Sequence, residues 1–331
     1  MKKNMKILIL GSGSFAGQIL FANFLRKGYE VYGINRSAPK NSSYWEWIKK
    51  IDSPLNWLEI NLYKETDLLI DAINKISPTH IVDFMGQGMV APSWDNPSLW
   101  YETNISKKTL LLDAIRKLDN IERYVRASTP EVFGSNENLI KEECNFNPST
   151  PYAVSHCAID YHIRCLGQQY NFPYAIGRFA NFYGEGQQLY RVIPRAILSC
   201  VTNKKFVLDG KGDSTRRFIN GNDIVSAIEA LLFKAPSKTE FNFSGKEDIT
   251  IENLIKLICD LTNVKFKKIV TYGPERKGKD MHYRLNCNKS KTELSWEPKV
   301  PLEKGILKVV EWIYRNKDFL SKQSWNYTHL L

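Results

Sequence analysis

An apolar run, a glycine-rich turn and a helical pattern follow one another at the amino terminus, and this order constrains the fold more than any other feature. Residues 6–10 are typical of a buried strand, and 18–26 are typical of a helix. The turn between them consists of Gly11, Ser12, Gly13, Ser14, Phe15, Ala16 and Gly17. Gly11 permits a tight turn, Ser14 is small enough for a pyrophosphate to approach, and Gly17 lets the helix pack closely on the strand. The segment is therefore a candidate dinucleotide site at a helix amino terminus, with a plain glycine turn as the alternative.

The alternation of strand and helix continues through the first half of the chain. Further strands are expected at 30–34, 60–62, 80–85, 124–127 and 174–178, with helices at 66–75, 99–118 and 152–170. Strands separated by helices pair in parallel and are covered by helices on both faces. The expected fold class is α/β, a doubly wound parallel Rossmann sheet with a smaller carboxyl-terminal α/β lobe.

The pattern changes after the strand at 174–178. A polar glycine loop at 181–187 and a helix at 192–201 come next, followed by a segment at 211–218 that resembles a hairpin with two arginines. Residues 1–185 are expected to form the dinucleotide-binding domain, to which 220–240 returns. Residues 186–219 and 241–331 are expected to form the smaller lobe, which closes over that domain and holds the substrate.

The end of the second strand bears on the choice of dinucleotide. An Asp or Glu there would bind the ribose hydroxyls of NAD, but the chain has Asn35, Arg36 and Ser37 instead. A guanidinium and a hydroxyl suit a ribose 2′-phosphate, so NADP is favoured while NAD stays open. The other positions expected to line the cofactor are Asn61, Leu62, Gly86, Gln87 and Asn104.

The clearest candidates for catalysis lie between residues 123 and 164. A buried strand is followed by Ser128, Thr129, Pro130 and Glu131. A helix then begins at Pro151 after capping hydroxyls, and Tyr152, His156 and Asp160 share one stripe of it because they are four residues apart. A tyrosine that faces hydroxyls at the end of a strand suits acid and base catalysis, although helical tyrosines more often pack in a core.

Composition narrows the class of protein. The formal net charge of +11 would suit a nucleic-acid binder or an enzyme of anionic substrates, but Lys and Arg are scattered, so no nucleic acid is expected as a partner. No run is apolar enough to cross a bilayer, and the run at 6–10 is too short for a signal peptide. The six cysteines lack CxxC pairs and framework spacing, which is typical of reduced thiols in a cytoplasmic protein.

Together these segments resemble the extended short-chain dehydrogenase/reductase family, in its nucleotide-sugar 4,6-dehydratase and epimerase branch. The resemblance covers nearly the whole chain, with Ser14 in place of the middle glycine of GxxGxxG. Residues 129–134 are similar to the family's T-x-E-x-Y-G, and 151–156 are similar to PYxxxK with His156 in place of the lysine. The segments that resemble those holding the nucleotide diphosphate are 181–184, 216–218 and 275–280.

The resemblance implies an NAD(P)-dependent nucleoside-diphosphate-hexose 4,6-dehydratase of the cytoplasm, active in polysaccharide biosynthesis, with a tightly bound, recycled cofactor and no metal. Tyr152 would take the proton of the sugar C4 hydroxyl, Thr129 would hydrogen-bond that oxygen, and Glu131 would remove the C5 proton. Tyr152 and His156 would also contact the cofactor. The implied substrate contacts are Gln87, Thr129, Asn181, Arg216 and Arg276.

A homodimer is also implied, because in the resembling family the helices equivalent to 99–118 and 152–170 pair across a twofold axis. Both segments carry apolar residues beyond one helical face. These residues are Leu110, Leu111, Leu112, Ile159 and Ile163.

Two positions depart from the family's pattern. Pro130 stands where some related dehydratases carry an acid, so Glu131 would serve as base and then as acid. His156 replaces a lysine that bonds the nicotinamide ribose and lowers the pKa of the tyrosine. A neutral His156 predicts slow turnover that rises with pH and improves in His156→Lys, whereas a histidine kept protonated by Glu131 or Asp160 predicts turnover that falls at alkaline pH; we favour the first. A 4-epimerase, a 4-dehydrogenase and an impaired sugar-nucleotide binder remain alternatives.

Overall fold

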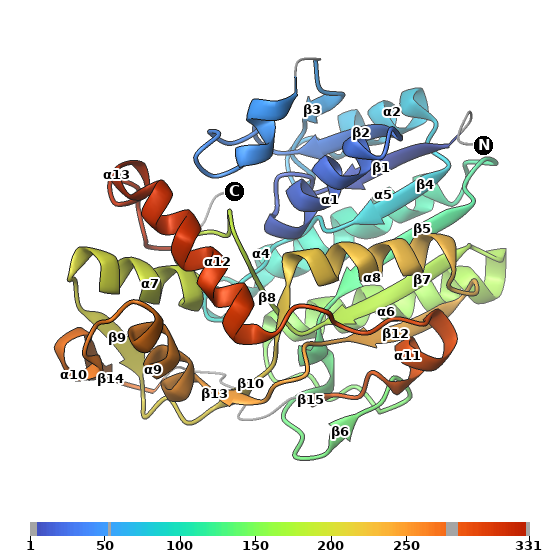
Figure 1. Ribbon diagram of the computed structural model, residues 1–331. Coiled ribbons are helices and arrows are strands. Elements are labelled where there is room, and N and C mark those ends of the chain that lie inside the picture. The colour runs from blue at the N-terminus through green and yellow to red at the C-terminus, as the bar shows by residue number, and fades with distance from the viewer. Residues whose placement is uncertain (1–4, 52–53, 276–283, 329–331) are drawn as a thin grey trace.

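A seven-stranded sheet lies at the centre of the computed structural model, which describes residues 5–51, 54–275 and 284–328 (Figure 1). The strands are β1 Lys6–Leu10, β2 Glu30–Asn35, β3 Trp57–Glu59, β4 His80–Asp83, β5 Arg123–Ser128, β7 Tyr174–Phe179 and β12 Thr239–Phe243. Their order is β12-β7-β5-β4-β1-β2-β3, and every neighbouring pair is parallel. The direction of winding reverses beside β1, where sheets of this kind bind ligands. The predicted doubly wound parallel sheet is confirmed.

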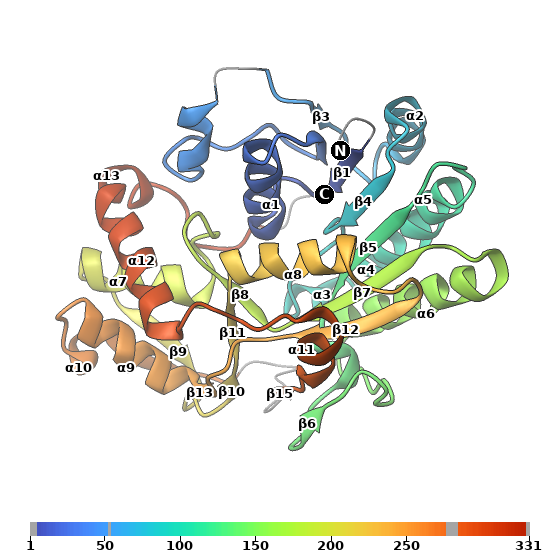
Figure 2. The ribbon, with the colours of Figure 1, turned by 45° about the vertical axis from the view of Figure 1, so that its right-hand side comes forward.

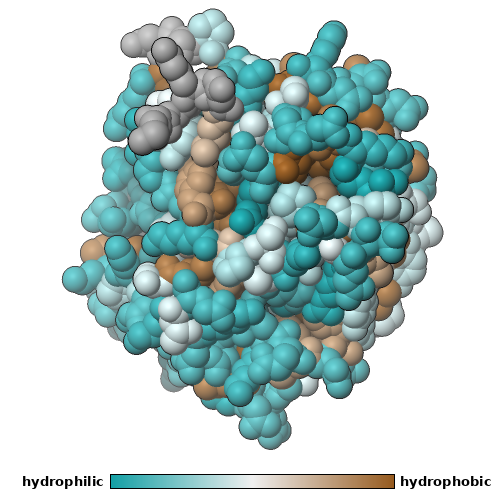
Figure 3. All heavy atoms as spheres, turned by 90° about the vertical axis from the view of Figure 1, so that its right-hand side faces the viewer, coloured by the Kyte–Doolittle hydropathy of each residue, from teal (hydrophilic) through white to brown (hydrophobic). Residues whose placement is uncertain are grey.

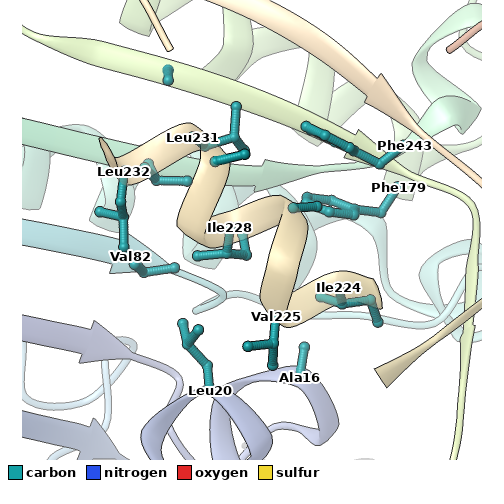
Figure 4. Packing of buried hydrophobic residues seen from close by; sticks show 14 of the residues in the cluster. Ala16, Leu20, Val82, Phe179, Ile224, Val225, Ile228, Leu231, Leu232 and Phe243 are labelled. Carbon is teal, nitrogen blue, oxygen red and sulfur yellow. The ribbon is translucent and has the colours of Figure 1, made fainter. Parts of the chain in front are cut away.

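Helices cover both faces of the sheet, and each face has its own apolar core. α1 Phe15–Arg26 and α8 Gly221–Phe233 lie on one face, and the other carries α2 Thr66–Ile76, α5 Lys108–Ile115 and α6 Pro151–Tyr170. The strands are apolar toward both layers because neither face meets water. Figure 4 shows side chains of α8, among them Ile228 and Leu231, gathered with Leu20 of α1 and Val82 of β4.

The helix expected at 99–118 consists of three consecutive pieces. These are α4 Pro97–Tyr101, the π-helical segment η2 Glu102–Lys107, and α5. A π-helical turn widens the helix and is frequent at functional sites, and here it contains Asn104. The third piece ends at Ile115 rather than Leu118, whereas the helix expected at 152–170 is found as α6 with one further residue at its start.

A separate apolar core forms the smaller lobe, which Figures 1 and 2 both show beside the sheet on the side of α7 and α12. Its elements are α7 Val192–Thr202, β9 Phe206–Asp209, α9 Ile251–Leu261, α10 Phe266–Ile269, β14 Val270–Gly273, α12 Leu302–Arg315 and α13 Lys317–Leu320. Ile197, Ile258 and Trp312 are fully buried between α7, α9 and α12. The parallel pair of β9 and β14 completes the lobe as an α/β unit, as predicted.

The hairpin expected at 211–218 is wrong. β9 already pairs with β14, so β10 Thr215–Arg216 pairs with β13 Ile249–Thr250 and not with β9. The next strand, β11 Phe218–Asn220, pairs in parallel with β8 Asn181–Tyr183. The remaining elements are η1 Glu46–Lys50, α3 Pro92–Asp95, η3 Pro130–Phe133, α11 Asn288–Leu294, and the pair of β6 Leu139–Ile140 with β15 Arg284–Leu285.

We propose two changes to the domain boundaries expected from the sequence. β12 pairs with β7 as far as Phe243, so a boundary after residue 240 would cut a strand of the large sheet. α11 also lies against β12, and Leu294 and Trp296 belong to the core under α8. We therefore propose that 220–243 and 284–297 accompany residues 1–185, while 186–219 and the other described residues after 243 form the smaller lobe.

No helix among the described residues is both long and apolar enough to cross a membrane. Figure 3 shows one face of the molecule, on which hydrophilic residues predominate and hydrophobic ones are scattered. Within the described part of the chain, no three His, Cys, Asp or Glu side chains are grouped so that they would hold a metal ion.

Candidate active site

The glycine turn after β1 lies directly against the end of β4. Gly11 has a φ of +75°, and a Cβ there would lie 2.9 Å from the backbone carbonyl carbon of Phe84. A Cβ on Gly17 would lie 2.3 Å from the carbonyl oxygen of Gly11. Ser14 caps α1 by accepting a hydrogen bond of 3.0 Å from the Gly17 amide. The amino terminus of α1 therefore stands at the carboxyl edge of the sheet with little side-chain bulk around it, which fits a dinucleotide diphosphate.

Two cations stand near the end of β2. Asn35 donates from Nδ2 to the carbonyl oxygen of Ser37 at 3.2 Å and to its hydroxyl at 3.1 Å. The same amide lies over Gly13, where a Cβ would come within 2.3 Å of Nδ2. Arg36 is exposed beside it, and desolvation together with the charge of Arg36 lowers the pKa of Lys40. A phosphate at this edge would meet both Arg36 and Lys40.

Three of the predicted cofactor residues can contribute only through their backbone. Phe15, Ala16 and Leu62 bury their side chains in the two cores of the sheet. Asn61 precedes Leu62 in the turn after β3, and its Oδ1 accepts a hydrogen bond of 2.9 Å from the amide of Tyr63. The backbone of these positions shapes the edge of the site, and the side chain of Asn61 makes a hydrogen bond within its own turn.

Asn104 holds the turn after β4 in place. Its Oδ1 accepts from the amide of Gln87 at 2.6 Å, and its Nδ2 donates to the carbonyl oxygen of Gln87 at 3.0 Å and to the hydroxyl of Ser155 at 3.0 Å. A Cβ on Gly86 would lie 2.9 Å from the same Oδ1. Because these bonds use the buried side-chain amide, Asn104 supports the cofactor edge by fixing the backbone of Gly86 and Gln87.

Three predicted catalytic residues meet where β5 ends and α6 begins. Thr129 caps η3 and accepts a hydrogen bond of 3.3 Å from the amide of Glu131, which sets the carboxylate one turn from the strand. Tyr152 lies in the first turn of α6, where its amide donates to the hydroxyl of Ser93 at 3.2 Å. The hydroxyl of Thr129 is hydrogen-bonded to the phenol of Tyr152. The predicted group of Thr129, Glu131 and Tyr152 is thus in one place.

The surroundings of Tyr152 disfavour the loss of the proton from its phenol. Desolvation and the nearby Glu131 carboxylate raise the pKa of Tyr152. The hydrogen bond with Thr129 and the charges of Arg191 and Arg126 lower it, but the net effect is a raised pKa. A phenol in this state needs positive charge close by before it can accept a proton near neutral pH.

His156 is held neutral. Its ring centroid lies 4.5 Å from that of Tyr152, and its Nδ1 lies 3.2 Å from Nη2 of Arg126. Desolvation, then the charges of Arg126 and Lys108, lower the pKa of His156 well below its ordinary value. The ring therefore carries no charge at neutral pH, which agrees with the interpretation that we favour from the sequence.

Asp160 does not hold a proton on His156. Its Oδ2 accepts hydrogen bonds from the hydroxyl of Ser128 at 2.8 Å and from Nη2 of Arg178 at 3.2 Å. The carboxylate thus faces β5 and β7 although it shares the helical stripe of His156. The alternative in which Asp160 keeps His156 protonated has no support in these contacts.

The sequence alone did not point to a buried group of charges beneath His156. Nζ of Lys108 donates to both carboxylate oxygens of Asp83 at 2.8 and 2.7 Å, and the hydroxyl of Tyr124 donates to Oδ2 at 2.5 Å. Arg126 follows, with Nη1 3.8 Å from the same oxygen. The signal that could have found this group is a charged residue inside each of two apolar strands, Asp83 in β4 and Arg126 in β5.

The predicted substrate residues are more dispersed than the catalytic ones. Asn181 begins β8, and the buried Arg216 ends β10, where its Nη1 donates to the carbonyl oxygen of Thr215 at 2.9 Å. The neighbouring Arg217 forms a double hydrogen bond with Asp248 at 2.7 and 3.0 Å, so Arg216 is the better candidate for a diphosphate. Arg276 lies outside the described residues.

A family model for GDP-mannose 4,6 dehydratase matches residues 8–309. The match extends over both lobes and includes the glycine turn, Thr129, Glu131, Tyr152 and Arg216. The chain belongs to the GDP-mannose 4,6-dehydratase family. This confirms the predicted branch, and with it the predicted enzyme class of NAD(P)-dependent nucleotide-sugar dehydratases and epimerases.

Individual relatives agree with the family. The chain is 25% identical to the dTDP-glucose 4,6-dehydratase of Salmonella typhimurium, with 97% of this chain and 98% of the relative covered. The solved dTDP-glucose 4,6-dehydratase of Streptomyces venezuelae, described with NAD and TYD bound, superposes with a TM-score of 0.87 at 24% identity, covering 95% of this chain and 98% of that one. The UDP-glucose 4-epimerase of Thermotoga maritima, described with UDP-glucose, has a TM-score of 0.86 at 24% identity, covering 95% and 100%. At these identities, the two solved structures support the fold.

Proposed function

We propose that this chain is an NAD(P)-dependent nucleoside-diphosphate-hexose 4,6-dehydratase. The observation that carries the proposal is the position of Glu131, which η3 sets beside the phenol of Tyr152 and the hydroxyl of Thr129. A simple exchange of hydride at C4 needs no carboxylate there, whereas removal of the C5 proton does. The relatives from Salmonella typhimurium and Escherichia coli are dTDP-glucose 4,6-dehydratases, which supports the same function.

The residues of the chain would take the following roles in the reaction. Tyr152 removes the proton of the C4 hydroxyl, and Thr129 donates a hydrogen bond to the oxygen that becomes the ketone. The ketone acidifies the C5 hydrogen, which Glu131 removes. Because Pro130 offers no acid, Glu131 returns its proton to the leaving C6 hydroxyl. The glycine turn and the amino terminus of α1 would hold the nicotinamide dinucleotide, which would supply the hydride chemistry at C4 and C6. The proton that Tyr152 takes from the C4 hydroxyl balances the proton that C5 regains.

The cofactor is NAD or NADP, and we propose a preference for NADP. The glycine turn and the free amino terminus of α1 fit the diphosphate that both dinucleotides share. The preference rests on Arg36 and Lys40, two cations at the strand end where an acidic residue would select NAD. The relative from Streptomyces venezuelae is described with NAD, so both cofactors belong in any assay.

The first test is a mass measurement of the product. Purified protein is incubated with GDP-, dTDP- and UDP-hexoses, with NAD or NADP added. We expect at least one donor to lose the mass of one water molecule and to form a keto sugar. Turnover without loss of water across the whole panel would contradict the dehydratase and favour a 4-epimerase or 4-dehydrogenase, the alternative that the Thermotoga maritima structure also represents.

We also propose a homodimer through the exposed face of α5 and α6. Four of the five apolar residues that the sequence offered for this interface, Leu111, Leu112, Ile159 and Ile163, are fully buried inside the protomer. Leu110 is 53% exposed and Tyr161 is 49% exposed, and Val154 is exposed on the same stripe of α6 as Tyr161. These exposed apolar side chains are what an isologous interface would cover.

Aspartate at Leu110 and Tyr161 should therefore convert the dimer to a monomer. Each charge would occur twice in an isologous interface, so the two substitutions place four desolvated carboxylates in it. Light scattering at micromolar protein should give the mass of one chain. Leu68→Asp is the matched control, because Leu68 is 52% exposed on α2 and should leave the mass unchanged. A wild-type protein that is already monomeric would refute the dimer.

The proposed setting is the cytoplasm, with the product used in polysaccharide biosynthesis. The six cysteines, which are all free, favour a reducing compartment. A deoxy sugar attached to a nucleoside diphosphate is an activated donor, so an enzyme that transfers glycosyl groups would consume the product.

A further inference from the structure

A cation from strand β5 lies directly against His156. Arg126 is only 3% exposed, and its Nη2 lies 3.2 Å from Nδ1 of His156. A guanidinium has donors and no acceptor, so Nδ1 accepts the hydrogen bond. The proton of a neutral His156 is then on Nε2, which leaves this nitrogen as a donor with a cation behind the ring.

Asp83 forms no hydrogen bond with Arg126. Nη1 of Arg126 lies 3.8 Å from Oδ2 of Asp83, which is beyond hydrogen-bond distance. The same carboxylate is already held by Lys108 and Tyr124, which donate to it at 2.5 to 2.8 Å. The Asp83 charge is therefore balanced mainly by Lys108.

Asp160 forms no hydrogen bond with Arg126 either. Its Oδ1 lies 3.9 Å from Nε of Arg126, and within the described structure neither atom has a hydrogen-bond partner. Oδ2 of Asp160 is taken by Ser128 and Arg178. Arg126 is thus surrounded by carboxylates that make their close contacts with other groups.

The charged network contains more cationic side chains than carboxylates. Arg178 donates to Glu240 at 2.7 Å, and Arg164 donates to both oxygens of Glu240 at 2.5 and 2.8 Å. The four cationic side chains face three carboxylates, namely Lys108, Arg126, Arg164 and Arg178 against Asp83, Asp160 and Glu240. Arg126 is the least closely paired of the four, since the other three cations each have a carboxylate within 3.2 Å.

We propose that Arg126 supplies the positive charge that this active site needs to deprotonate Tyr152, and that it acts through a neutral His156. The guanidinium stays charged at every pH at which the enzyme would work. In the resembling family one lysine supplies both the charge and the hydrogen bond to the ribose. Here Arg126 would supply the charge, and Nε2 of His156 would donate the hydrogen bond. Arg126 is a positioning residue, because it touches His156 and not the substrate.

Other charges also act on the pair, and Arg191 lowers the pKa of Tyr152 more than Arg126 does. The groups concerned are Asp83 of β4, Lys108 of α5, Glu131 of η3, Asp160 of α6 and Arg191 at the start of α7. Arg191 lowers the pKa of Tyr152, and Lys108 lowers that of His156. Arg126 acts on both pKa values, as expected for a cation that lies against the imidazole ring next to the phenol.

A titration of His156 tests the contact without any substrate. Histidine labelled with ¹⁵N is followed by NMR against pH, and the signal of His156 is assigned from its loss in His156→Gln. In the wild-type protein we expect a neutral ring with the proton on Nε2 down to about pH 6. In Arg126→Met the pKa of His156 should rise by about one unit or more, while Arg126→Lys should keep it low. An unchanged titration in folded Arg126→Met would overturn the proposal, whatever reaction the enzyme performs.

The kinetic test takes the proposed function as its basis. Arg126→Met should lower kcat at neutral pH about tenfold for each unit by which the Tyr152 pKa rises, and it should move the rise of kcat to higher pH. Arg126→Lys should keep the wild-type profile within a few-fold, and adding His156→Lys to Arg126→Met should restore activity. The matched control is Arg164→Met, which removes a cation of the same network away from His156 and should leave the pH profile unchanged. A wild-type profile in Arg126→Met would contradict the proposal.

The single variant His156→Lys tests the role of Arg126 if Arg126→Met does not fold. With Arg126 in place, a lysine at position 156 would bring a second cation against the guanidinium. We therefore expect no gain in turnover at about pH 8, where histidine is neutral, and a lower melting temperature. This reverses the expectation from the sequence, in which a neutral His156 leaves the charge missing and His156→Lys raises turnover. A clear gain in turnover would show that Arg126 does not supply it.

Discussion

Glu131→Gln should stop the loss of water while oxidation at C4 continues. Glutamine has the shape of glutamate but cannot accept the C5 proton, and a missing general base typically costs about 10²–10⁴-fold in rate. The first step should be spared, because the Glu131 carboxylate raises the pKa of Tyr152 and its removal makes that phenol the easier base. The enzyme should therefore stall after C4 oxidation.

Hydrogen exchange at C5 measures this step directly. In D₂O the wild-type protein should place deuterium at C5 during turnover, and Glu131→Gln should do so about 10²–10⁴ times more slowly. Glu137→Gln is the matched control, since Glu137 lies exposed a few residues further along and should not change the rate. Full water loss by Glu131→Gln would remove the basis for assigning the dehydratase.

Much of the sheet was predictable because its inner strands are buried on both faces. Runs such as Lys6–Leu10 and Tyr174–Phe179 must be apolar on both sides, and Gly11 must adopt a positive φ against Phe84. Local chemistry decides such features. The predicted start of α6 at Pro151 was equally local, because Thr150 accepts a hydrogen bond from Ala153 at 3.1 Å.

Features that depend on distant partners could not be predicted. The strand Thr215–Arg216 pairs with β13 because β9 has already paired with β14, and nothing near Thr215 in the sequence indicates that. The π-helical turn at Asn104 depends on Gln87 and Ser155, which lie 17 and 51 residues away along the chain. Tertiary contacts between distant segments determine this strand pairing and this helical turn, and a single sequence does not reveal such contacts.

The candidate site shows the same division. Thr129, Glu131 and Tyr152 follow a motif, so they were predicted together and are found together. Arg126 was overlooked because a charged residue within an apolar strand contradicts the pattern that defined the strand. Its meaning depends on His156 being 3.2 Å away, a contact between two elements that only the folded chain brings together.

Tyr152→Phe should lower turnover by about 10²–10⁴-fold with little change in substrate affinity. The substitution removes the hydroxyl that takes the C4 proton and leaves the ring, whose centroid lies 4.5 Å from that of His156. The loss of the hydrogen bond with Thr129 costs about 0.5–1.5 kcal/mol, so the protein should stay folded. Steady-state turnover, nucleotide-sugar binding by calorimetry and a melting curve measure the three effects separately.

The same variant separates an enzyme from an impaired binder. In a binder, Tyr152 has no chemical task, so Tyr152→Phe would bind the nucleotide sugar like the wild-type protein and neither would form product. Tyr161→Phe is the matched control, because it removes a hydroxyl from an exposed position on the same helix and should leave turnover unchanged. Wild-type turnover by Tyr152→Phe would exclude Tyr152 as the base. Glu131, Thr129 and Arg126 all influence the pKa of this one phenol. Such a result would therefore also contradict the proposal that they act together to control its proton.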